Sequence, residues 1–158
     1  MSNSGIAALS SQAFGGYTRE QLRSSYAEAW RKHLARVPLT PLESLIADVI
    51  AHHPEYQALV GDARAVQAFD PSPGTAAENP FLHMGLHLAI REQMSIDRPP
   101  GVRQIQQALT ARLGDGHDAE HVLMEALAET LWEAQRDGQP PDERRYLDRA
   151  RAHIKARD

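Results

Sequence analysis

The feature that most constrains this fold is a series of helix-starting and helix-ending signals, with no alternating β-branched run of strand length. The clearest start is a capping box formed by Thr40 and Glu43, with Pro41 at the first helical position. Thr18 and Gln21 match the same box at an earlier helix. The chain is therefore predicted to be all-α, a single-domain bundle of five or six helices.

Breaker residues divide the chain into these helices. Pro54 interrupts one of them, and clusters of proline, glycine and aspartate at 70–74 and 97–101 mark turns. Residues 1–16 are expected to be a flexible N-terminal tail, and residues 17–158 a single helical domain. Short helical turns are expected over 55–60 and 63–69. The main helices are expected over 18–37, 40–53, 80–94, 102–113, 117–136 and 142–156.

Charge and hydropathy exclude several classes of protein. The chain has 17 basic and 21 acidic residues among 158, so its net charge of -4 gives no reason to bind nucleic acid or an anionic membrane. No apolar run approaches the roughly 18 residues of a membrane span, and the first residues do not resemble a secretory signal. We expect a cytoplasmic protein whose partner is an unknown small molecule, a second copy of the chain, or none.

Several catalytic and cofactor motifs are absent. There is no phosphate-binding G-x-x-x-x-G-K-[ST] loop, no dinucleotide-binding G-x-G-x-x-G and no nucleophile elbow G-x-S-x-G. The sequence therefore carries no nucleotide or flavin signature. E-x-x-H is also absent, which disfavours a ferritin-type di-iron site.

The eight histidines and the absence of cysteine direct attention to imidazole chemistry. Without cysteine there is no disulfide, no thiolate nucleophile and no cysteine-containing zinc site. Any transition metal must then be held by imidazole and carboxylate alone.

The histidines fall on helix faces in a repeated pattern. Positions four apart share a face of a helix, so two pairs at this spacing each align with apolar residues. His33 and His53 continue the apolar stripes of the first two helices, whereas His52 and His153 do not. Six histidines are thus expected on core-facing stripes, and four of them form the pairs His83 with His87 and His117 with His121.

The two pairs lead to our main hypothesis, a helical domain that binds a transition metal between facing helices. Zinc is the first guess, because it accepts imidazole nitrogen at about 2.0–2.1 Å in tetrahedral geometry, although nickel, copper and iron also bind imidazole. Glu120 lies beside the second pair as a ligand, an orienting group or a general base. The candidate ligands are His83, His87, His117 and His121, followed by His53 and Glu125.

Other interpretations of these residues stay open. In the first, the protein is a non-enzymatic structural or interaction protein whose histidines are hydrogen-bonded core residues. In the second, His117 and Asp118 resemble the paired ligands of helical, metal-dependent phosphohydrolases. Residues 117–121 also match the inverted zincin signature H-x-x-E-H, but only 37 residues follow His121, too few for such a peptidase.

Short blocks spread along the chain carry a resemblance to a known family. The blocks are residues 53–56, 79–83, 87–90, 95–97 with 99–101, 117–119 and 131–134. Together they resemble a bacterial family catalogued as domain of unknown function 1841, over nearly the whole chain after the N-terminal tail. The resemblance implies a small bacterial protein and supplies no activity and no catalytic residue, so the metal hypothesis depends on the helix faces.

Overall fold

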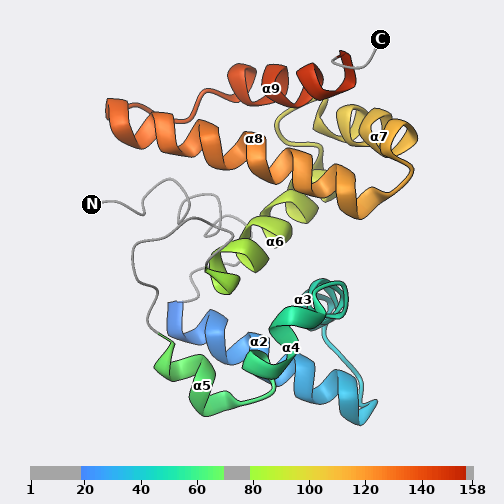
Figure 1. Cartoon of the computed structure of the whole chain (residues 1–158), viewed down its shortest axis with the longest axis vertical. Helices are drawn as coiled ribbons and strands as arrows, with labels where there is room; N and C mark the ends of the chain where they lie inside the picture. Colours follow the sequence, from blue (N-terminus) through green and yellow to red (C-terminus); the bar gives the residue numbers. More distant parts are fainter. Residues whose placement is uncertain (1–18, 70–78, 156–158) are drawn as a thin grey trace. The chain divides into compact units, whose positions relative to one another are not determined.

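The computed structural model of the chain describes residues 19–69 and 79–155, and every regular element in these ranges is an α-helix (Figure 1). The all-α prediction is therefore confirmed. The predicted number of five or six helices is wrong, because these ranges contain eight. The predicted tail at 1–16, the cap at Thr18 and the breaker cluster at 70–74 lie outside the described residues.

The additional helices are two short ones that local signals separate from their neighbours. Pro54 begins α4 (Pro54–Val60), since proline has no N–H with which to continue the preceding helix. Asp62 then caps α5 (Ala63–Ala68), accepting hydrogen bonds from the backbone N–H groups of Arg64 and Ala65.

The chain divides into two compact units, and the division falls inside α6 (Pro80–Ile96), between Leu88 and Ala89. We call them the N-terminal unit, which includes described residues 19–69 and 79–88, and the C-terminal unit, which includes described residues 89–155.

The N-terminal unit is organised by the contact of α2 (Arg19–Ala35) with α3 (Pro41–Ala51). The predicted capping box is confirmed: the Glu43 N–H donates to Thr40 Oγ1 (3.1 Å), and the Thr40 N–H donates to Glu43 Oε1 (2.9 Å). Lys32 of α2 reaches the other carboxylate oxygen of Glu43 at 2.8 Å. The same glutamate therefore starts α3 and ties it to α2.

The buried apolar residues of these helices recur at three- and four-residue intervals, as on one face of a helix. Each large aliphatic or aromatic side chain removed from water contributes roughly 1.5–3 kcal/mol to folding. The stripes comprise Tyr26, Ala29 and Trp30 on α2 and Ile46, Ala47, Val49 and Ile50 on α3.

Helix α2 ends at Ala35, two residues before the predicted end at Val37. Arg36 takes the left-handed conformation (φ 58°), and the Val37 N–H donates to the carbonyl of Lys32. The next residue is Pro38, which disfavours the helical conformation at Val37. The helix therefore ends with the left-handed residue placed just before this restricted position.

An arginine fixes α5 against the start of α6. Arg23 of α2 donates from Nη1 to the carbonyl of Phe69 at 2.7 Å, and its guanidinium lies 4.9 Å from the ring centroid of Phe81. The cation is thus placed over an aromatic face while Nη1 donates to a carbonyl, and both contacts offset part of the cost of its burial.

The C-terminal unit packs the second half of α6 with α7 (Val102–Leu113), α8 (Gly116–Asp137) and α9 (Glu143–Lys155). Asp97, with φ 51°, makes the corner between α6 and α7 and accepts from the Arg103 N–H at 3.0 Å. The phenol of Tyr146 on α9 donates to Gln93 Oε1 on α6 at 2.5 Å inside the core.

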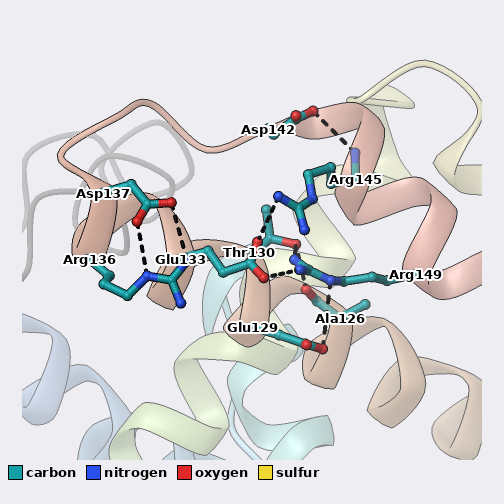
Figure 2. Close-up of polar contacts among 9 residues, drawn as sticks. All are labelled: Ala126, Glu129, Thr130, Glu133, Arg136, Asp137, Asp142, Arg145 and Arg149. Carbon is teal, nitrogen blue, oxygen red and sulfur yellow. Dashed lines mark hydrogen bonds and ion pairs between the residues drawn. The ribbon is translucent and has the colours of Figure 1, made fainter.

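Ion pairs fasten α9 to α8 (Figure 2). The Arg149 guanidinium donates to Thr130 Oγ1 at 2.9 Å and forms ion pairs with Glu133 and, at 3.7 Å, Glu129. Arg145 lies 3.5 Å from the second oxygen of Glu133. The hydrogen bond from Arg149 is the main reason that the pKa of Glu133 lies below its ordinary value.

No helix in the described ranges is long and apolar enough to cross a membrane.

Candidate functional site

His53 lies at the corner between α3 and α4. Its backbone leaves the helical region (φ −127°, ψ 73°) because Pro54 disfavours that region in the preceding residue. The His53 N–H donates to the carbonyl of Ile50 (3.0 Å), and the His53 carbonyl accepts from the N–H of Tyr56 (2.9 Å). The corner is therefore held by backbone hydrogen bonds on both sides of a buried histidine.

His83 and His87 lie one turn apart in the first half of α6. Asn79 starts this helix by accepting from the N–H groups of Phe81 and Leu82, and Pro80 is its first residue. The two imidazole rings meet edge to face with centroids 4.8 Å apart. His87 is fully buried and His83 is half-buried, so the pair extends from the core toward the surface.

These three residues, which we call the three-histidine cluster, bring their Nε2 atoms together within the N-terminal unit. Nε2 of His87 lies 2.9 Å from Nε2 of His53 and 3.1 Å from Nε2 of His83. Potential ligand nitrogens of the cluster all lie within 4.8 Å of one another. The fold thus brings His53 next to a histidine pair that lies 30 or more residues later in the sequence.

Nε2 of His87 has two close nitrogen neighbours but only one site for a hydrogen bond. A ring nitrogen of neutral histidine either donates one N–H or accepts at one lone pair. Nε2 of His87 nevertheless lies at hydrogen-bonding distance from two other ring nitrogens. A single N–H or lone pair must then be shared, whereas a cation at the centre can accept all three lone pairs.

Two neighbours in sequence surround the imidazole of His53. Glu55 Oε1 lies 2.7 Å from His53 Nδ1, and this hydrogen bond is the main cause that holds the pKa of Glu55 below its ordinary value. The ring of Tyr56 stacks on His53 with centroids 5.2 Å apart, and it meets His83 edge to face at 5.8 Å. Partial burial raises the pKa of the Tyr56 phenol. His53 is therefore held from its Nδ1 side and from one ring face.

The second predicted pair, His117 and His121, lies on α8 in the C-terminal unit. Its rings meet edge to face with centroids 4.4 Å apart, and both residues are half-buried. Glu120, between them, accepts from Arg91 Nε at 3.1 Å, and Glu125 is exposed. The i, i+4 spacing thus places the two rings in contact, as the helix period requires.

The prediction that His33 faces the core is wrong. Its side chain is exposed and stacks on the ring of Trp30, with centroids 5.0 Å apart. His33 lies in the last turn of α2, where Leu34 is also 64% exposed. A periodic stripe predicts which side of a helix is apolar, but it does not predict how far along the helix a neighbour covers it. His52 and His153 are exposed, in agreement with their positions off the apolar stripes.

Sequence reasoning missed the roles of Glu55 and Tyr56 and ranked His53 behind the two pairs. The available signal was the run from His53 to Tyr56, in which a histidine precedes proline and a carboxylate follows two residues later. Pro54 fixes the start of α4, so the next two side chains project from its first turn. One corner thus carries a ring nitrogen, its hydrogen-bond partner and a stacking ring.

Comparison with known proteins identifies a family whose description names no activity. A family model described as Domain of unknown function (DUF1841) matches residues 18–152. No curated protein and no solved structure matches the chain.

Proposed function

Since the chain belongs to the family described as Domain of unknown function (DUF1841), a description that names no activity, we propose a function from its geometry: it binds a divalent transition metal. The proposed ligands within the N-terminal unit are Nε2 of His53, His83 and His87. The observation that carries the proposal is the approach of two ring nitrogens to Nε2 of His87, at 2.9 and 3.1 Å.

The spacing of these nitrogens supports a metal. In a tetrahedral zinc site with Zn–N bonds of about 2.0–2.1 Å, neighbouring nitrogens lie about 3.3–3.4 Å apart. The two short separations in the cluster are a few tenths of an ångström below that value. A small outward movement of the rings converts a shared hydrogen bond into a ligand set.

Burial also supports this function. His87 is fully buried and His53 is 5% exposed, so their nitrogens cannot depend on bulk water for partners. A metal ion supplies a strong partner to every lone pair at once. Because imidazole suits zinc, copper, iron and nickel and the chain has no thiolate, zinc is our first choice within that group.

The role of the ion depends on its fourth position. Three protein ligands with an open position would leave a metal-bound water, which is the arrangement of hydrolytic zinc sites. A fourth protein ligand would make the site structural. His117, His121 and Glu125 are further candidates from the sequence alone.

Elemental analysis of untagged purified protein tests the proposal. We expect about one transition-metal ion per chain, a melting temperature that falls after treatment with a strong chelator, and its recovery on adding Zn²⁺. Free zinc at 100 times the dissociation constant would add about 2.7 kcal/mol to the free energy of unfolding.

The matched variants are His53→Ala and His52→Ala, which remove neighbouring histidines, one buried in the cluster and one exposed. Only His53→Ala should remove the response to zinc. Substoichiometric metal, no chelator effect and no response to zinc would contradict the proposal and favour hydrogen-bonded core histidines.

A further inference from the structure

The corner that carries His53 also carries Glu55, an exposed residue whose carboxylate contacts a buried imidazole. Glu55 is largely exposed, with 58% of its side chain accessible, yet Oε1 is 2.7 Å from Nδ1 of a histidine whose side chain is 7% accessible. The two residues are separated only by Pro54, so the start of α4 itself brings them together.

The contact determines which nitrogen of His53 is available to a cation. An ionised carboxylate only accepts hydrogen bonds, so Nδ1 of His53 must donate to Glu55. In the neutral imidazole the lone pair is then on Nε2. Nε2 is the atom that lies 2.9 Å from Nε2 of His87, and the lone pair is therefore directed into the cluster.

We propose that Glu55 is the positioning residue of the metal site, selecting Nε2 of His53 as the ligand atom through its hydrogen bond to Nδ1. This inference rests on the proposed function. The arrangement is a carboxylate–histidine–metal triad, in which the outer carboxylate orients the ring and makes its ligand nitrogen more basic. Tyr56 assists by stacking on the ring of His53, which limits rotation of that ring.

A second acidic residue provides a matched control. Asp48 lies 3.8 Å from Nδ1 of His52, and both side chains are about half accessible. Asp48→Ala removes the same charge near the same corner without touching His53. Any loss caused only by a change in net charge will be equal in Asp48→Ala and Glu55→Ala.

The experiment measures the zinc affinity of the full chain by competition with a chromophoric chelator, for wild type, Glu55→Ala, Glu55→Gln and Asp48→Ala. We expect Glu55→Ala to weaken affinity by about 10–100-fold, the usual effect of losing such a partner. Glu55→Gln keeps a carbonyl oxygen that can accept from Nδ1, so it should stay within a few-fold of wild type. Asp48→Ala should change affinity less than twofold.

A spectroscopic measurement separates positioning from a general effect on folding. In the zinc-loaded protein, nitrogen-15 NMR should identify Nε2 of His53 as metal-bound and Nδ1 as protonated. Glu55→Ala should speed the exchange of that Nδ1 proton with water, whereas Asp48→Ala should not. The Co²⁺ absorption spectrum should change in Glu55→Ala and be retained in Glu55→Gln.

The outcomes distinguish the two proposals. If wild type binds neither Zn²⁺ nor Co²⁺, the proposed function fails. If wild type binds zinc and Glu55→Ala has the affinity of Asp48→Ala, the metal site stands and the role of Glu55 is overturned. Equal losses in Glu55→Ala and Glu55→Gln would likewise overturn positioning by the hydrogen bond.

Discussion

Two histidine pairs with the same spacing have different surroundings in the two units. On α6, His83 and His87 are joined by His53 from the corner between α3 and α4, and the Nε2 atoms of His53 and His83 lie 2.9 and 3.1 Å from that of His87. On α8, His117 and His121 contact each other, and the acidic residue between them is engaged by Arg91. Spacing of i, i+4 aligns two rings on one helix, and in the N-terminal unit a histidine from outside α6 adds a third ring nitrogen to the pair.

The largest expected effect follows from removing the centre of the three-histidine cluster. Loss of an outer hydrogen-bond partner weakens metal affinity by about 10–100-fold. His87→Ala removes a ligand itself, so it should weaken zinc affinity by more than that. His117→Ala, from the other pair, is the comparison and should change affinity much less. Isothermal titration of both variants checks this, and equal losses would reverse the distinction between the pairs.

A double-mutant cycle tests whether residues of the three-histidine cluster hold the same ion. The proposed function assigns His53 and His83 to one ion, so we expect the losses from His53→Ala and His83→Ala to be non-additive. Zinc affinity and melting temperature are measured for both single variants and the double variant. Additive losses would contradict a shared ion.

Another variant should lower the stability of the C-terminal unit and leave the three-histidine cluster unchanged. Tyr146→Phe removes the phenol that donates to Gln93 in the core and leaves a buried acceptor oxygen without it. We expect a loss of about 1–3 kcal/mol in the free energy of unfolding, measured with urea. Zinc affinity should be unchanged, and a marked decrease would show that the metal site depends on this hydrogen bond.

The smallest expected effect is a pH-dependent contribution in the N-terminal unit. The hydrogen bond to Lys32 is the main cause that lowers the pKa of Glu43 from about 4.5 to about 2. Because the folded pKa is depressed, this stabilisation is complete above pH 4.5 and is lost as pH falls toward 2. The Lys32–Glu43 ion pair therefore stabilises the fold less in acid than at neutral pH.

Glu43→Gln tests that contribution while keeping a residue suited to the capping box. The difference in unfolding free energy between wild type and Glu43→Gln should be largest at neutral pH and shrink between pH 4.5 and 2. Urea denaturation at several pH values measures it. A difference that does not vary with pH would contradict the role assigned to the Lys32 ion pair.

Local signals predicted most helix boundaries well. Thr40 with Glu43 predicted the start of α3, and the residues expected for the fourth main helix, 102–113, coincide with α7. These signals depend on groups a few residues apart, such as a side-chain oxygen and the unpaired N–H groups of a first turn. They also explain α4 and α5, which Pro54 and Asp62 separate.

The candidate site was less predictable because its contacts join residues that are far apart in the sequence. His53 and His87 are 34 residues apart, and no helix period relates positions on different helices. Glu55 and Tyr56 carried no periodic signal at all, although they lie beside His53. His33 shows the opposite case, in which a regular stripe predicted burial that the end of α2 does not provide.

The sequence by itself determined the all-α class, the positions of the main breaks and the two aligned histidine pairs, because these depend on capping, proline chemistry and the helix period. Only the tertiary structure decided that His53 meets His83 and His87, and that Glu55 holds its other ring nitrogen. The physical reason is that tertiary packing sets the distances between residues far apart in the sequence, and local periodicity does not specify these distances.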